Sequence, residues 1–177
     1  SGFWIVSDLI DPDNKTAENS YKQSWHMLPN AGLVGDDAAK TISSNFKSGA
    51  NIIVASADGD ARIQEEMGLH DYSYGQIAES KFAYAAKDDV KGKATFDTVL
   101  LPYKNPGGAE IQVSRLDMGT STAEATALRF DSVIDGTKEN VQYMLDYAFD
   151  QKEERSFGGY QTTAKLALVR SAGGNIK

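Results

Sequence analysis

Turn-forming residues recur roughly every 8–12 positions along this 177-residue chain, and that spacing constrains the fold more than any other feature. Between the turns, apolar and polar side chains alternate with a period of two, which is the period of a half-buried β-strand. Spacing of this kind is typical of antiparallel all-β sandwiches rather than of βαβ units. We therefore expect strands over residues 3–10, 20–28, 40–47, 50–57, 61–69, 81–87, 93–101, 109–118, 123–134, 140–149 and 162–170.

Residues 95–103, TFDTVLLPY, differ from the other segments because both of their faces carry apolar side chains. Phe96 and Leu100 fall on one face, and Val99 and Leu101 on the other. We expect a strand that is covered on both sides and that ends at Pro102, which has no N–H to donate to a ladder.

Two local patterns set the connections between strands. Asp135-Gly136 is expected at the turn of a hairpin, and DDVKG (88–92) also looks like a hairpin turn. Residues 122–130, TAEATALRF, could form a helix because Ala and Leu favour one, but the hairpin that follows favours a strand. The prediction is all-β: a single antiparallel β-sandwich of stacked sheets over residues 1–177, without an internal domain boundary.

Composition excludes several classes of function. The net charge is −7 with no dense Lys/Arg patch, so a nucleic-acid partner is not expected. There is no cysteine for a disulfide or a thiolate site, and no apolar run of about 18 residues that could span a membrane. The chain opens on Ser-Gly and enters a strand at once, so we expect a fragment of a longer protein.

Four segments, in this order and spacing, resemble the C-terminal β-domain of the heparinase II/III-like polysaccharide lyases. The resemblance covers roughly residues 1–105 and fades afterwards. An opening strand pairs with a strand that ends in an aromatic-His step, and a Tyr-rich segment and a "Tvl-P" strand follow. The matching residues are Trp4 to Ile10, Gln23 to Leu28, Tyr72 to Gly75, and Phe96 to Tyr103.

The resemblance implies a stacked antiparallel sandwich that, in the parent enzymes, follows an (α/α) toroid. Such lyases cleave uronate-containing polysaccharides by β-elimination in the cleft between the two domains, with Tyr, His and Asn or Arg as the proton-transfer and charge-neutralising groups. The implied partners are a uronate-containing polysaccharide and an N-terminal (α/α) toroid of the same protein. The implied location is the periplasm or the exterior of a bacterial cell.

This sequence departs from the family at the reactive groups. It has no H-x-H-x-D segment and no helical N-terminal region. We therefore assign no catalytic residue, no metal ligand and no cofactor. The two histidines do not change this, because 44 positions separate them and no pattern of carboxylates flanks them. We expect His26 to be a partly buried strand residue, and His70 to lie in a loop.

Tyrosines are the candidates for sugar binding, because an exposed aromatic ring can stack on the apolar face of a sugar. Tyr72 and Tyr74 would share one face of a strand, and Tyr103 could extend their platform. His70 precedes them and completes the candidate carbohydrate-binding set. Trp4, Tyr21 and Trp25 are further candidates to extend the platform. For Trp4 and Trp25 packing in the sheets is the preferred interpretation, and Tyr143 and Tyr147 are expected to shield a sheet.

The loop DPDNK carries Asp11, Asp13 and Asn14, which echo the start of a calcium loop. It lacks the Gly and the bidentate Glu that complete that pattern, so a polar hairpin loop is the preferred interpretation. A calcium site completed by Asp58 and Asp60 is the alternative.

Three functions follow from these observations. The first is an accessory β-domain of a heparinase II/III-like lyase, without a catalytic centre of its own. The second is an autonomous carbohydrate-binding module with a tyrosine platform. The third is a residual lyase centre in which His26 or His70 acts beside a tyrosine.

Overall fold

The computed structural model describes residues 2–29, 31–148, 153–172 and 175–176, and the side chains of all of these except 72, 175 and 176. In these residues the chain forms fifteen strands and no helix, which confirms the all-β prediction. With no helix there, the described part of the chain contains no helical membrane span.

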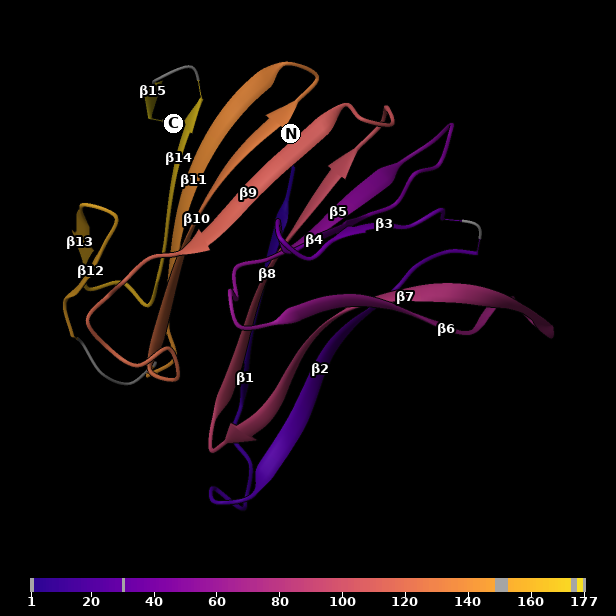
Figure 1. The fold of residues 1–177 in the computed structure, drawn as a ribbon. Helices are drawn as coiled ribbons and strands as arrows, with labels where there is room; N and C mark the ends of the chain where they lie inside the picture. Colours follow the sequence, from indigo (N-terminus) through magenta and orange to yellow (C-terminus); the bar gives the residue numbers. More distant parts are fainter. Residues whose placement is uncertain (1, 30, 149–152, 173–174, 177) are drawn as a thin grey trace.

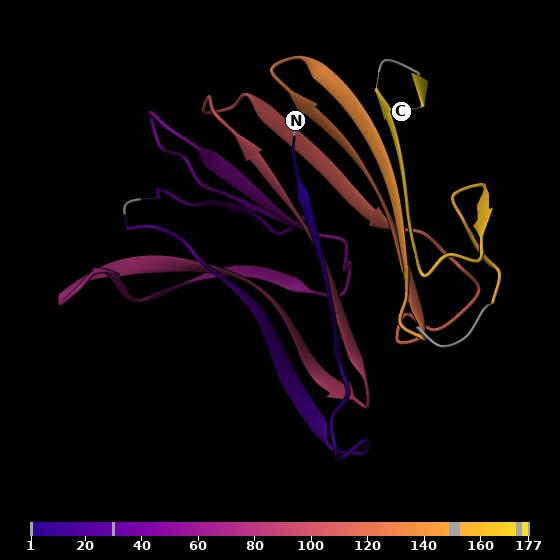
Figure 2. The same cartoon turned by 180° about the vertical axis from the view of Figure 1, so that it is seen from behind.

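Three antiparallel sheets stack on one another, as Figures 1 and 2 show from opposite sides. The middle sheet is ordered β1 (Trp4–Ile10), β8 (Ala94–Tyr103), β5 (Asn51–Ser56), β4 (Thr41–Ser43) and β3 (Val34–Asp36). The first outer sheet is ordered β2 (Glu18–His26), β7 (Gln76–Lys91) and β6 (Arg62–Ser73). The second outer sheet is ordered β15 (Asn175–Ile176), β14 (Leu166–Ala172), β11 (Thr137–Asp146), β10 (Ala125–Ile134) and β9 (Ala109–Arg115).

The hydrophobic core lies in two layers, one on each face of the middle sheet. Phe96 and Leu100 of β8 pack toward the first outer sheet, in clusters with Ala85 and Ala83 of β7. Val99 packs toward the second outer sheet with Leu128, Phe130, Val141 and Tyr143. The predicted burial of residues 95–103 on both faces is therefore confirmed.

The expectation that Pro102 ends this strand is wrong. β8 continues to Tyr103, and Pro102 lies opposite Ile52 of β5. β1 pairs with β8 only as far as Leu100. Beyond that point the ladder runs to β5 alone, so a residue without an N–H can face the unpaired side of the strand.

The hairpin expected at residues 88–92 does not form. β7 ends at Lys91 in the first outer sheet, and β8 begins at Ala94 in the middle sheet. Asp89 and Gly92 both have positive φ (55° and 73°), so the chain turns sharply where it passes between the two layers.

The other predicted hairpin is present. β10 and β11 pair from Ala125↔Asp146 to Ile134↔Thr137, across the two-residue turn Asp135-Gly136. Both turn residues have positive φ (47° and 79°), as a type I′ turn requires. Residues 125–134 are thus a strand and not the competing helix. Outside this sheet, the two-stranded ribbon β12 (Arg155–Phe157) and β13 (Tyr160–Thr162) covers Met144 and Ala127.

Candidate functional site

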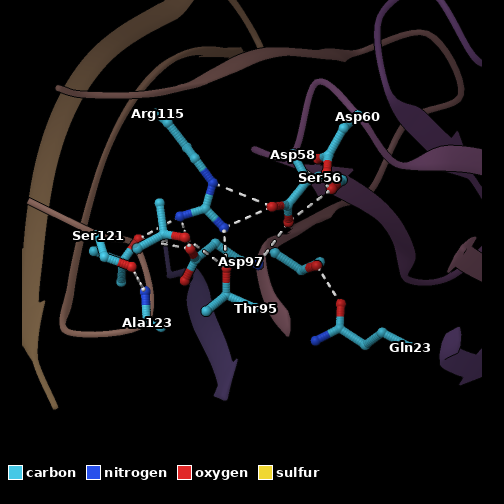
Figure 3. Close-up of polar contacts among 12 residues, drawn as sticks. Gln23, Ser56, Asp58, Asp60, Thr95, Asp97, Arg115, Ser121 and Ala123 are labelled. Atoms are coloured by element: carbon cyan, nitrogen blue, oxygen red, sulfur yellow. Dashed lines mark hydrogen bonds and ion pairs between the residues drawn. The ribbon is translucent and has the colours of Figure 1, made fainter. Parts of the chain in front are cut away.

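A buried charge cluster joins all three sheets around Asp58, directly after β5 (Figure 3). Asp58 is only 1% exposed. Its carboxylate accepts hydrogen bonds from Nζ of Lys87 in β7 (2.7 Å), Nη2 of Arg115 in β9 (2.6 Å) and the backbone N–H of Asp97 in β8 (2.9 Å). One side chain therefore connects the middle sheet to both outer sheets.

Arg115 has no N–H left for a substrate. Its Nε and Nη2 bond to Asp58, and Nη2 also reaches Thr95 (3.2 Å). Its Nη1 contacts Asp97 Oδ2 and Thr126 Oγ1, both at 2.6 Å. A guanidinium has five N–H donors, and these contacts engage all five. Arg115 thus cannot neutralise the carboxylate of a bound uronate without breaking the cluster.

The pKa directions of the buried groups also oppose a role in catalysis. Burial raises the pKa of the Tyr147 and Tyr143 hydroxyls, and the nearby charge of Asp97 raises them further. Burial likewise raises the pKa of Asp97, against the opposing effects of Arg115, Ser7 and Thr126. A tyrosine that acts as a general base needs a lowered pKa, so neither tyrosine is prepared to remove a proton at neutral pH.

The two histidines lie in the first outer sheet and do not come together. His26 lies in the strand β2 as expected, but the expectation that it is partly buried is wrong: it is exposed, with its ring against Phe82 of β7 at a centroid distance of 4.1 Å. The expectation that His70 lies in a loop is wrong, because it lies within β6, opposite Ala78. Phe82 of β7 lies opposite His26 on one side and opposite Glu66 of β6 on the other. His70 is four residues beyond Glu66 along β6, which is about 13 Å at the rise of a strand.

The predicted tyrosine platform is not assembled as one surface. Tyr74 lies at the turn between β6 and β7 and is fully exposed. Tyr103 is 8% exposed, lies in the core with Ile53 and Leu101, and donates its hydroxyl to the carbonyl of Ser44. Its ring is therefore not offered to a sugar. The backbone of Tyr72 lies in β6, and its side chain lies outside the described residues.

Other aromatic residues follow the expectations only in part. Trp25 and Tyr21 pack against the core clusters of the first outer sheet, and Tyr143 is buried in the second. Trp4 was expected to pack in a sheet, but it is 59% exposed. It lies opposite Leu100, at the end of the β1–β8 pairing.

The DPDNK loop is closed by its own polar groups. Asn14 Oδ1 accepts hydrogen bonds from the N–H groups of Thr16 (3.0 Å) and Ala17 (3.2 Å), and Asp11 forms ion pairs with Lys15 and Lys93. Asp58 and Asp60, the residues considered for completing a calcium site, instead share Lys87. Within the described residues, no three His, Asp or Glu side chains gather where they could hold a metal ion.

The sequence analysis missed an apolar surface on the β6–β7 hairpin, which extends away from the stacked sheets in Figure 1. Met67, Leu69 and Ile77 are 55%, 68% and 65% exposed. Ile77 lies opposite Asp71, and alternate residues of a strand share a face, so Ile77 lies on the same face as Met67 and Leu69. Glu65, also on this face, lies opposite buried Ala83. The three apolar residues therefore continue the face that covers the core nearer the base of the hairpin. We call these three residues the apolar hairpin face. The signal in the sequence was the alternation of Met67 and Leu69 with polar residues.

Comparison with known proteins gives a structural match and no sequence match. No protein-family model and no curated protein matches the chain. The solved structures of heparan sulfate lyase HepC from Pedobacter heparinus, in two forms of which one is a mutant, match with a TM-score of 0.62 and 20% identity. The match covers 79% of this chain and 22% of the lyase. The chain therefore shares the fold of a part, about a fifth, of a heparan sulfate lyase.

Proposed function

We propose that this chain is the C-terminal, accessory β-domain of a larger polysaccharide lyase of the heparinase II/III-like kind, without a catalytic centre of its own. The fold shared with part of a heparan sulfate lyase is the observation that carries the proposal. The closed Arg115 cluster, the raised pKa of the buried tyrosines and the separation of the two histidines support the absence of a catalytic centre.

The apolar hairpin face indicates how such a domain would act. Exposed apolar patches rimmed by polar residues mark surfaces that bind other proteins, and Glu65 and Glu79 lie beside this one on the same hairpin. In the proposed parent enzyme, the N-terminal (α/α) toroid covers Met67, Leu69 and Ile77. Tyr74 and His70 of the same hairpin then face a uronate-containing polysaccharide at the domain boundary. This work takes place in the periplasm or outside the cell.

The experiment combines a reaction assay with a measurement of association. The chain is incubated with heparin, heparan sulfate and alginate, and the absorbance of an unsaturated uronate product is followed. We expect no rise with any of the three. A rise with one of them would show that the chain contains a catalytic centre.

Sedimentation velocity over a range of concentrations then tests the hairpin. Without its covering domain the wild-type chain should self-associate, and Leu69→Lys should weaken that association at least about tenfold, because a buried leucine contributes about 1.5–3 kcal/mol. Leu168→Lys is the matched control, since Leu168 is 49% exposed but lies in the second outer sheet. Equal effects of both variants, or of neither, would show that the hairpin is not a docking face.

A further inference from the structure

The outer face of the second outer sheet carries a shallow groove that the sequence did not predict. Its volume is about 580 Å³, which is within the range of ligand sites. The ribbon β12–β13 covers one end of this sheet face through Phe157 and Tyr160. The groove occupies the part that the ribbon leaves open.

Two rows of side chains cross the strands along the groove. The first row is set by direct register: Gln112 lies opposite Asp131, Asp131 opposite Asn140, and Asn140 opposite Ser171. Neighbouring strands are about 4.8 Å apart, so these four polar groups span about 14 Å in a line. The second row consists of Glu110, Val133 and Lys138, again in register.

The polar groups of the first row are held in place, and some of their hydrogen-bond donors and acceptors are left without a partner in the described part of the chain. Asn140 Nδ2 donates to Asp131 Oδ1 at 2.7 Å, and Arg129 holds the same carboxylate from the side. This arrangement leaves the amide oxygen and the second N–H of Asn140 for a ligand. The Gln112 amide has no hydrogen-bond partner among the described residues and lines the groove beside them.

The chemistry of the groove fits hydroxyl groups better than anions. Carboxylate and amide groups side by side can accept from and donate to neighbouring hydroxyls, and Val133 offers an apolar surface to the C–H face of a sugar ring. Glu110 and Asp131 make the groove unfavourable for a sulfate or a uronate on a chain of net charge −7. Among the described residues that line the groove, Lys138 is the one cation, and Arg129 beside it is already paired with Asp131. The spacing of the strands is also close to the repeat of an extended 1→4-linked hexose chain.

We propose that the row Gln112–Asp131–Asn140–Ser171 binds a neutral, hydroxyl-rich glycan that lies across the strands. This inference goes beyond the proposed function and does not depend on it. It assigns a second glycan surface, on the opposite side of the stack from the β6–β7 hairpin, with a preference opposite to that expected for an anionic polymer.

Affinity electrophoresis tests the proposal with soluble hydroxyethyl cellulose, xylan and galactomannan as probes and heparan sulfate as the anionic comparison. We expect at least one neutral polymer to retard the wild-type chain. Asp131→Ala and Gln112→Ala should each weaken that retardation, Asp131→Ala at least about tenfold because a hydrogen bond to a charged group is lost. Glu18→Ala is the matched control, since Glu18 is an exposed carboxylate of β2 in the first outer sheet and is paired with a cation, Lys91, as Asp131 is with Arg129.

Thermal unfolding followed by circular dichroism shows whether each variant is folded. If Asp131→Ala does not fold, Gln112→Ala alone tests the groove. No retardation of the wild type by any neutral polymer would overturn the proposal. Retardation that survives both groove variants, or that heparan sulfate abolishes by competition, would also overturn it. None of these outcomes bears on the lyase assay or on the association of the hairpin.

Discussion

At the scale of single residues, Asp58 is the side chain on which the stacking depends most. Asp58→Asn keeps the shape of the side chain but leaves Lys87 and Arg115 buried with less negative charge. Removing one partner of a buried ion pair costs about 3–5 kcal/mol, and we expect a loss of that size in the free energy of unfolding, measured with urea. Asp60→Asn is the control, because Asp60 contacts the same Lys87 at 3.1 Å but is 73% exposed. Its effect should stay below about 1 kcal/mol, and a similar loss in both variants would contradict the assignment.

The sequence could not reveal this role of Asp58. The predicted strands 50–57 and 61–69 left Asp58 and Asp60 in the connection between them, where the structure also has them, and calcium was the ligand considered for them. Lys87 and Arg115 lie 29 and 57 positions away, on strands of two other sheets. A local pattern does not encode which charges meet after stacking. The burial of Tyr103 could not be predicted for the same reason. Alternation could show that Tyr103 faces one side of a strand, but not that another sheet covers that side.

At the scale of elements, the register of the β6–β7 hairpin depends on Gly68. A Cβ built on Gly68 would overlap the ring of Phe82, which lies between Gly68 and the ring of His26. Since β6 is an edge strand, this is an aromatic ring covering an edge glycine. Gly68→Ala should cost about 1–3 kcal/mol in the free energy of unfolding, the usual cost of overpacking. It should also displace Phe82 from His26, which the NMR shifts of the histidine ring would report.

Gly59→Ala is the control for that change. A Cβ on Gly59 meets nothing within 4 Å and the residue does not have positive φ, so the substitution should be neutral or slightly stabilising. Equal destabilisation by the two variants, or an unshifted His26 ring in Gly68→Ala, would show that Phe82 does not depend on the glycine.

Most strands were predictable, but their connections were less so. Asp135-Gly136 was recognisable because both residues tolerate positive φ. The turn at Tyr74-Gly75 was not, because Tyr is not a typical turn residue and only Gly75 has positive φ (73°) there. The hairpin therefore extends past Leu69, where the predicted strand ended, and carries His70 into a strand. At DDVKG the turn residues were correctly recognised, but they connect two different sheets and do not form a hairpin.

At the scale of the whole molecule, alternation identified the middle layer but not its neighbours. Apolar residues on both faces of 95–103 required cover on two sides, and the two outer sheets provide it. Which strands make those sheets depends on long-range pairing, such as β1 with β8 and β2 with β7. Period two carries no information on that pairing, so the sandwich was predictable and its three-layer order was not.

The response of the whole fold to acid depends on two buried aspartates with opposite shifts. Burial raises the pKa of Asp146, but hydrogen bonds from Arg155 and the N–H of Ala148 outweigh it and hold this pKa below the ordinary 3.8. Asp146 therefore stabilises the fold at neutral pH, and that contribution is lost as pH falls through its folded pKa. Burial raises the pKa of Asp97 above 3.8. As pH falls, Asp97 is thus protonated at a higher pH in the folded state than in the unfolded state. Asp97 therefore makes the fold relatively more stable as pH falls toward 3.8.

Two substitutions should consequently change the pH dependence of the free energy of unfolding in opposite directions. Asp146→Asn should lower the free energy of unfolding at neutral pH by about 1–3 kcal/mol and reduce the further loss between about pH 5 and pH 3, because the titrating group is gone. Asp97→Asn should make the loss over the same interval larger, since it removes the group whose protonation favours the fold. Urea unfolding at the two pH values and at neutrality measures both slopes. Slopes that change in the same direction would show that one of the two carboxylates is not in the electrostatic environment that the stacked sheets give it.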